Sequence, residues 1–171
     1  MEMEKAFTDT LDGKKVQMFR LSNKEGMSVA FSNYGATILS IQVPNKKGKM
    51  ENVVLGYDSA KDLFAGKSYF GCIVGRYANR IANGKFTIDC QTFSAPQNNG
   101  INSLHGGVNS IDKRVWDVRQ MNDAISFSIK IKESNDHSLY AINSNVEIID
   151  FFIILDFLFL INTSSYFFKT F

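Results

Sequence analysis

The segment Ala36-Thr37-Ile38-Leu39-Ser40-Ile41-Gln42-Val43 carries the clearest strand pattern in the sequence, and it stops at Pro44. It is rich in β-branched residues, which favour strands, and proline cannot continue a paired central strand. The residues that follow, Asn45 to Lys49, include Gly48 and are typical of a tight turn. We therefore predict a strand over 36–43 that leads into a hairpin turn.

Short runs of alternating apolar residues, separated by turn residues, continue on both sides of this hairpin. They predict further strands at 16–21, 27–31, 53–56, 85–88, 91–94, 115–119 and 124–131. The pair around Asp89-Cys90 resembles a hairpin with a two-residue turn, in which cysteine stands where glycine is usual. A single helical turn is predicted from the capping residue Ser59 to Phe64. Many short strands and little helix indicate an all-β sandwich.

The composition changes after about Lys132. Seven of the fifteen Phe residues follow residue 150, in a stretch of Ile, Leu and Phe that contains Asp150 and Asp156. We therefore divide the chain into a β-sandwich segment, residues 1–131, and a divergent tail, residues 132–171. The tail is a buried strand, a buried helix or a segment foreign to the domain. Two aspartates in so short an apolar run disfavour insertion into a membrane.

Composition and charge limit the partners and the location of the protein. Hydrophobic residues make up 44% and charged residues 21%, as in soluble globular proteins. The net charge of +2 is weak, and the tightest basic group, Lys46, Lys47 and Lys49, lies on the predicted turn, so we expect no nucleic-acid partner. Cys72 and Cys90 lack metal-ligand spacing, which predicts free thiols and no metal site. The first residues lack a signal-peptide pattern, which favours a cytoplasmic location.

Polar side chains are concentrated in two stretches. The first, Gly75-Arg76-Tyr77-Ala78-Asn79-Arg80-Ile81, sets two arginines and an asparagine between apolar neighbours. Arginine offers five donors and asparagine both a donor and an acceptor, a set that suits sugar hydroxyls. A structural role, in which an arginine pairs with a carboxylate or caps a loop, is the alternative.

The second stretch, Asn98-Asn99-Gly100-Ile101-Asn102-Ser103-Leu104-His105-Gly106-Gly107, is a loop dense in turn formers with one histidine. Glycines beside it allow the backbone to approach a ligand closely. A histidine in such a loop is a candidate ligand-binding residue. A histidine satisfied by structural hydrogen bonds is the alternative.

These stretches, with Gly84-Lys85-Phe86 and Asp112-Lys113-Arg114-Val115-Trp116, follow one another in an order and spacing that resemble the aldose 1-epimerase (galactose mutarotase) family. Asn33-Tyr34-Gly35-Ala36 and Val54-Leu55-Gly56-Tyr57 are similar too, so the resemblance spans about Phe7 to Ile131. It implies a partial β-supersandwich, incomplete at the C-terminus. It also implies interconversion of the α and β anomers of hexoses such as galactose and glucose, with a hexose as the partner and without a cofactor.

The resemblance implies that Asn79, Arg80 and His105 bind the substrate, because they match family positions that hold the sugar. In the family reaction a general base takes the proton of the C1 hydroxyl while a general acid protonates the ring oxygen, which opens the ring. Three further residues match the motifs and are equally consistent with packing or loop roles: Arg76, Tyr77 and Trp116.

The residues that move protons in the family have no match in the sequence. The family acid is the histidine of an Asn-His-x-Tyr-Phe-Asn-Leu motif, and its base is a glutamate near the end of a chain about twice this long. His137 comes only 32 residues after His105, too early for the intervening family strands, and Glu147 has no family context. We therefore expect a chain that holds a sugar but lacks the catalytic pair. A noncatalytic carbohydrate-binding module and an inactive truncated fragment are the alternatives.

Overall fold

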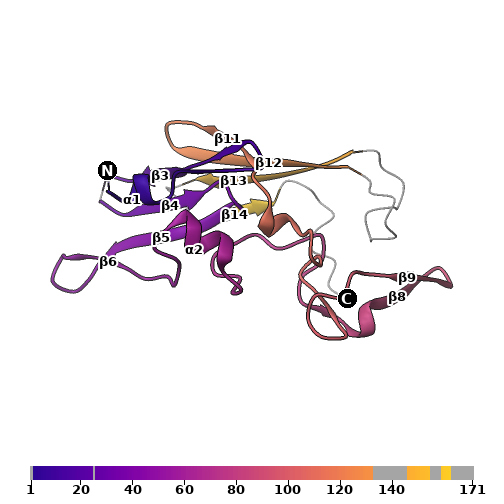
Figure 1. Cartoon of the computed structure of the whole chain (residues 1–171). Coiled ribbons are helices and arrows are strands. Elements are labelled where there is room, and N and C mark those ends of the chain that lie inside the picture. Colours follow the sequence, from indigo (N-terminus) through magenta and orange to yellow (C-terminus); the bar gives the residue numbers. More distant parts are fainter. Residues whose placement is uncertain (1, 25, 133–145, 155–158, 163–171) are drawn as a thin grey trace.

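Two four-stranded antiparallel sheets lie one above the other in the computed structural model, which describes residues 2–24, 26–132, 146–154 and 159–162 (Figure 1). The first sheet contains, in order, β3 (Met18–Ser22), β4 (Ser28–Ser32), β5 (Thr37–Pro44) and β6 (Met50–Asn52). The second contains β11 (Asp117–Gln120), β12 (Ala124–Lys132), β13 (Val146–Ile154) and β14 (Phe159–Asn162). The predicted all-β sandwich is confirmed.

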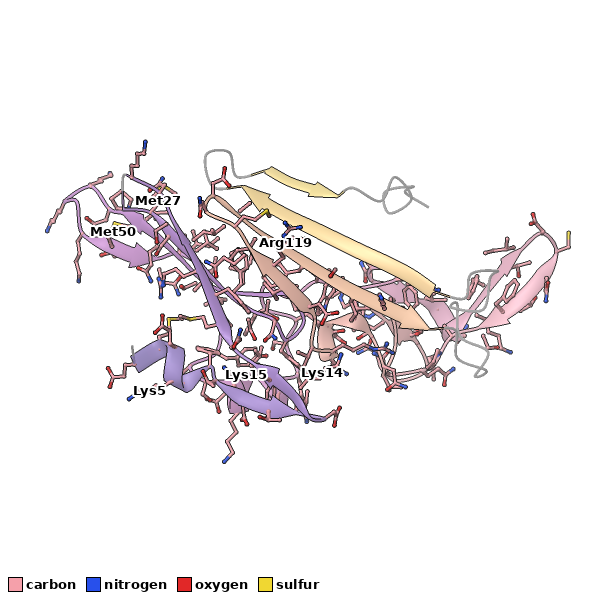
Figure 2. The ribbon with its side chains drawn as sticks, turned by 90° about the horizontal axis from the view of Figure 1, so that it is seen from above. Lys5, Lys14, Lys15, Met27, Met50 and Arg119 are labelled. Carbon is pink, nitrogen blue, oxygen red and sulfur yellow. The ribbon has the colours of Figure 1, made fainter. Side chains whose placement is uncertain are left out.

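Smaller elements surround the two sheets. They are α1 (Glu2–Ala6), the hairpin of β1 (Asp9–Leu11) and β2 (Lys14–Val16), α2 (Ala60–Ala65), the pair β7 (Arg80–Ile81) and β10 (Ser103–Leu104), the hairpin of β8 (Lys85–Ile88) and β9 (Gln91–Ser94), and two 3-10 turns, Ala82–Gly84 and Ile111–Lys113. The β8–β9 hairpin extends away from both sheets (Figure 2). No helix of the described ranges is long and apolar enough to cross a membrane.

The β4 strand is buried on both of its faces. Successive side chains of a strand point to opposite faces of its sheet. Val29 and Phe31 accordingly join the core between the two sheets, whereas Ala30 joins a second core on the other face. That second core is closed by Phe7, next to α1, and by Leu63 of α2.

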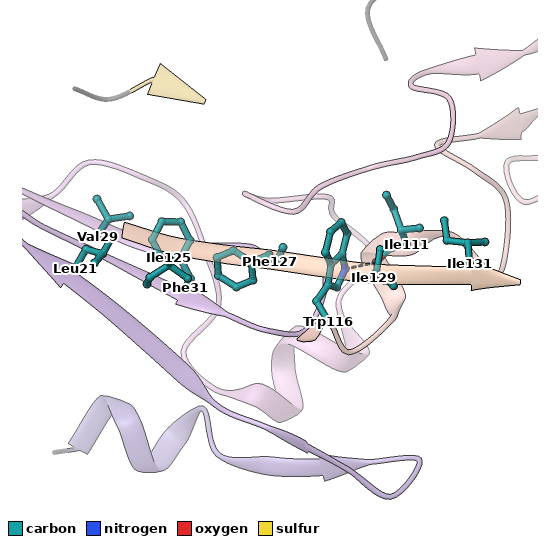
Figure 3. Packing of buried hydrophobic residues seen from close by; sticks show 10 residues of the cluster. Leu21, Val29, Phe31, Ile111, Trp116, Ile125, Phe127, Ile129 and Ile131 are labelled. Atoms are coloured by element: carbon teal, nitrogen blue, oxygen red, sulfur yellow. Dashed lines mark hydrogen bonds between the residues drawn. The ribbon is translucent and has the colours of Figure 1, made fainter. Parts of the chain in front are cut away.

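The core between the sheets runs along β12 (Figure 3). The ring of Phe127, which is fully buried, lies with its centroid 6.4 Å from that of Phe19 and 5.6 Å from that of Phe31. Trp116 is buried in the same core, and its Nε1–H donates to the carbonyl of Ile111 at 3.0 Å. One aromatic ring of β12 therefore touches two strands of the opposite sheet.

Three local predictions are confirmed. The Asn45 side chain closes the predicted turn, because its Oδ1 accepts from the amides of Lys47 and Lys49 at 2.8 and 3.0 Å. The predicted helical turn is α2, and the Ser59 hydroxyl caps it by accepting from the Asp62 amide at 3.1 Å. The β8–β9 hairpin forms around Asp89-Cys90.

The predicted strand at 53–56 is wrong, because the paired strand is β6, which ends at Asn52. The Asn52 side chain explains the shift. Its Oδ1 accepts from the amides of Ile41 and Val54 at 3.0 and 3.3 Å, and its Nδ2 donates to the carbonyl of Val54 at 3.1 Å. The Val53 amide still donates to the Ile41 carbonyl at 3.0 Å, but the Asn52 side chain takes the Ile41 amide, so regular strand pairing ends at Asn52.

The predicted strand at 16–21 is divided, because β2 ends at Val16 and β3 begins at Met18. Asn33 occupies the break. Its Oδ1 accepts from the amide of Gln17 at 2.9 Å, and its Nδ2 donates to the carbonyl of Lys15 at 3.0 Å. These bonds take the place of strand pairing and let the chain change sheets.

In the tail, β13 pairs with β12 over nine residue pairs, from Ala124 opposite Ile154 to Lys132 opposite Val146. The domain boundary after residue 131 stays a prediction. Glu147 lies in β13, opposite Ile131, and His137 lies outside the described residues.

Candidate functional site

The two polar stretches meet as a short antiparallel pair. In the β7–β10 pair Arg80 lies opposite Leu104, and the amide of His105 extends the pairing by donating to the carbonyl of Asn79 at 3.1 Å. Asn79 and His105 both have positive φ, 68° and 52°, a region that asparagine and histidine adopt more readily than most residues. Asn79, Arg80 and His105, 26 residues apart along the chain at most, are thereby brought together.

The His105 imidazole is oriented by the backbone of Asn79. Its Nδ1 accepts from the Asn79 amide at 2.9 Å. A nitrogen that accepts carries no proton, so the neutral ring has its proton on Nε2, which is then a donor. Burial lowers the pKa of His105 below its ordinary value of 6.5, and the charge of Arg80 lowers it further, against an opposing effect of Asp112. The imidazole is therefore mostly neutral near neutral pH.

The Arg80 guanidinium is exposed and held by amides. Its Nε donates to Asn99 Oδ1 at 2.9 Å, and its Nη1 lies 3.4 Å from Asn79 Oδ1, which also accepts from the Arg80 amide at 2.9 Å. Within the described part of the chain these two side chains are its only hydrogen-bond partners, and neither is a carboxylate. The charge of the guanidinium is therefore not paired with a carboxylate of the described residues. Most of its five N–H donors are available to a ligand.

The asparagine-rich loop is fixed by its own side chains. The Asn98 side-chain amide bonds to the backbone of Leu104 as a neighbouring strand residue would. Its Oδ1 accepts from the Leu104 amide at 2.7 Å, and its Nδ2 donates to the Leu104 carbonyl at 2.9 Å. Asn102 Oδ1 accepts from the Asn83 amide at 3.1 Å. The loop that presents His105 and supports Arg80 is therefore held in shape by hydrogen bonds of its own side chains.

Glycine is required where this loop meets the segment before β7. Gly106 has a φ of 92°, and a Cβ atom there would collide with the carbonyl of Gly75 and with the Ser110 side chain. This close approach sets the loop against the residues just before Arg76. The bond network continues in Tyr77, whose hydroxyl contacts Ser103 Oγ, while Ser103 donates to the Pro96 carbonyl at 2.5 Å.

A buried carboxylate lies behind the site. The Asp112 side chain is 8% exposed and accepts a hydrogen bond from the Ser110 hydroxyl. Burial raises the pKa of Asp112, although the Ser110 bond and the charges of Lys113 and His105 oppose the shift. Asp112 and Cys72 share the lining of a small cavity of about 40 Å³, and burial raises the pKa of the Cys72 thiol to about 12.

Sequence reasoning missed three residues of this arrangement: Asn99, Asp112 in its role behind the site, and Tyr69. The ring of Tyr69 lies 4.6 Å from the His105 imidazole, centroid to centroid, at an interplanar angle of 59°. Asn99 lies in the motif stretch 98–107, which predicted a loop but not a contact with Arg80, and Tyr69 lies in none of the motif stretches. Of the other motif residues, Trp116 lies in the core and Arg76 is half-buried. A larger cavity, of about 430 Å³, opens elsewhere, between the β1–β2 hairpin and β12.

Comparison with known proteins now adds to this geometry. The sequence model of the family described as aldose 1-epimerase matches residues 17–149. The chain belongs to the aldose 1-epimerase family. The match begins in the first strands of the sandwich and includes every residue of the β7–β10 pair.

Curated members of the aldose 1-epimerase family are similar over this region. A probable aldose 1-epimerase of Arthroderma benhamiae is 44% identical over 110 residues, which cover 60% of this chain and 25% of the relative. A galactose mutarotase of Bos taurus is 40% identical over 113 residues, covering 66% of this chain and 33% of the relative. An aldose 1-epimerase of Escherichia coli is 38% identical over 112 residues, with 66% and 32% covered. The chain spans about a third or less of the length of these relatives.

Solved structures agree with the family fold. An aldose epimerase homologue from C. elegans matches with a TM-score of 0.72 at 30% identity, covering 82% of this chain and 42% of that one. A galactose 1-epimerase from Lactobacillus acidophilus matches with a TM-score of 0.68 at 26% identity, with 85% and 42% covered. The sandwich of this aldose 1-epimerase family chain is therefore the galactose mutarotase-like fold that the sequence predicted.

Proposed function

We propose that this chain supplies the sugar-holding part of a site that interconverts the α and β anomers of hexoses such as galactose and glucose. The observation that carries the proposal is the meeting of Asn79, Arg80 and His105 on the β7–β10 pair, where the exposed guanidinium is held, among the described residues, by the side chains of Asn79 and Asn99. A planar fork of donors and a fixed imidazole N–H suit the hydroxyl and ring oxygens of a pyranose.

In this proposal the three side chains orient the sugar and do not transfer protons. His105 is mostly neutral near neutral pH, since burial lowers its pKa, so it donates a hydrogen bond through Nε2 rather than a proton. The Arg80 guanidinium offers hydrogen-bond donors only. Proton transfer needs a general acid and a general base within hydrogen-bond reach of the reacting oxygens. The histidine motif and the glutamate that supply them in the family have no match in the sequence, so the chain is expected to bind hexose without accelerating anomerisation.

Calorimetric titration with galactose, combined with polarimetry of freshly dissolved α-galactose, tests both parts. The Arg80→Ala variant should bind galactose about 10- to 150-fold more weakly, because hydrogen bonds to a charged group contribute about 1.5–3 kcal/mol. Arg119→Ala, which removes an exposed arginine of β11, is the matched control and should bind as the wild type does.

Two results would contradict the proposal. If galactose binds the wild type and Arg80→Ala with equal affinity, Arg80 does not contact the sugar. A polarimetric rate above that of buffer alone, lost in His105→Gln, would show that this chain moves protons after all.

A further inference from the structure

Tyr69 contacts the imidazole of the candidate site. Its half-buried ring lies 4.6 Å from the His105 imidazole at 59°, a distance typical of favourable contacts between aromatic rings. The comparisons assign no role to this residue, and the proposed sugar contacts do not include it. Its position against the imidazole therefore needs an account of its own.

The chain around Tyr69 is anchored on both sides. Before it, the carbonyl of Ser68 accepts from the Tyr57 hydroxyl at 2.8 Å. After it, the carbonyl of Gly71 accepts from the Ile38 amide of β5 at 2.9 Å. Gly71 has a φ of 64°, and a Cβ atom there would collide with the Ile38 carbonyl, so the segment lies directly on the sheet. Tyr69 is thus held next to His105 between Tyr57 on one side and β5 of the first sheet on the other.

One hydrogen bond does not fix an imidazole ring. The outer torsion of a histidine side chain is broad and roughly two-fold, so a ring held at Nδ1 alone can tilt or turn over. A half-turn would put Cδ2 in the place of Nδ1 and break the hydrogen bond from the Asn79 amide. A neighbouring ring in contact with the imidazole limits that freedom. The Asn79 amide at Nδ1 and the Tyr69 ring, tilted by 59° against the imidazole, together restrain it.

We propose that Tyr69 is a positioning residue, whose ring holds the His105 imidazole in the orientation in which Nδ1 accepts from Asn79 and Nε2–H faces the ligand. The ligand part of this statement rests on the proposed function, whereas the hold on the imidazole does not. The same ring helps to bury His105. The groups that act on the charge of the imidazole are Arg80, which disfavours its protonation, and Asp112, which favours it.

Nitrogen-15 NMR of the full chain tests the proposal directly. The sequence has only two histidines, so His105 and His137 can be told apart with a His137→Asn variant. In the wild type we expect an unprotonated Nδ1, a protonated Nε2, and nuclear Overhauser contacts between the Tyr69 and His105 rings. Absence of those contacts in the wild type would overturn the proposal without any variant at position 69.

Two substitutions separate the ring from the hydroxyl. Tyr69→Phe keeps the ring and should leave the tautomer and pKa of His105 unchanged. Tyr69→Leu removes the ring, so the NMR signals of the two His105 tautomers should average. The pKa of His105 should rise towards its ordinary value as burial is lost. Galactose should bind roughly two- to tenfold more weakly, because the imidazole is no longer pre-oriented.

Phe70→Leu is the matched control, because it removes the neighbouring ring, which contacts Tyr57 at 5.8 Å and not His105. It should leave both His105 nitrogens unaltered. A folded Tyr69→Leu chain with the wild-type tautomer and pKa would overturn the proposal. A wild type that shows the expected His105 spectrum but no galactose binding would support the hold by Tyr69 and refute the proposed function.

Discussion

At the scale of single residues, the candidate site depends on asparagine side chains that take the place of backbone or charged partners. The family motifs were sufficient to predict that Asn79, Arg80 and His105 belong together. They did not predict that Asn99 would hold the guanidinium, because that contact depends on how the asparagine-rich loop folds back. The contact of Tyr69 with His105 joins residues on separate segments, and no local pattern encodes it.

Asp112 offers a prediction at this scale. Its pKa is raised in the folded protein, chiefly by burial, so the folded state binds the proton more tightly than the unfolded state does. The carboxyl therefore contributes stability at low pH that is lost as the pH rises from the ordinary value of 3.8 through the raised value. Asp112→Asn keeps an oxygen that can accept from Ser110 and removes this titration. Its melting temperature relative to the wild type should be higher at about pH 7 than at about pH 4.

Thermal unfolding followed by circular dichroism at both pH values measures this difference. Asp117→Asn, at an exposed position of β11, corrects for the general effect of removing one negative charge. An Asp112→Asn difference that is the same at both pH values would contradict the prediction.

At the scale of elements, the sequence was most informative where a single local residue determines the structure. Ser59 caps α2, and the turn residues close the β8–β9 hairpin, so both were predicted. The strand at 53–56 was wrong because the Asn52 side chain competes with the ladder. The β7–β10 pair was missed because strands of two residues have no periodicity, and only pairing across the chain defines them.

The β8–β9 turn gives the prediction for this scale. Asp89 and Cys90 have φ values of 48° and 63°, and such left-handed backbone costs a residue with a Cβ atom more than it costs glycine. Cys90→Gly should stabilise the hairpin by about 0.5–1 kcal/mol, equivalent to roughly two- to fivefold slower amide exchange in β8 and β9.

Native-state hydrogen exchange is the suitable measurement, because the hairpin extends away from the sheets and can open without them (Figure 1). Thr92→Gly, at an interior position of β9, is the control. Glycine in a strand interior should speed exchange instead, by a similar factor. Equal or faster exchange in Cys90→Gly would refute the argument from backbone geometry.

At the scale of the whole molecule, the alternating strands predicted a sandwich but not which faces meet. The contacts that join the two sheets link residues about a hundred positions apart, as in the bond from Gln120 Nε2 to the carbonyl of Arg20 at 3.0 Å. Such pairings depend on packing across the complete core. The family resemblance, and not the periodicity, therefore supplied the arrangement of the sheets.

Phe127 provides the test of that core. It is fully buried on β12, and its ring touches Phe19 of β3 and Phe31 of β4. Phe127→Ala should lower the free energy of unfolding by about 3–5 kcal/mol, a large part of the ~5–15 kcal/mol that is typical of a domain. Because the ring joins both sheets, circular dichroism and the fluorescence of the single tryptophan, Trp116, should report one shared transition at lower urea. Lys130→Ala, at an exposed position of the same strand, should change stability by less than about 0.5 kcal/mol. Two separate transitions in Phe127→Ala, or a midpoint equal to that of the wild type, would show that the sheets do not depend on this contact.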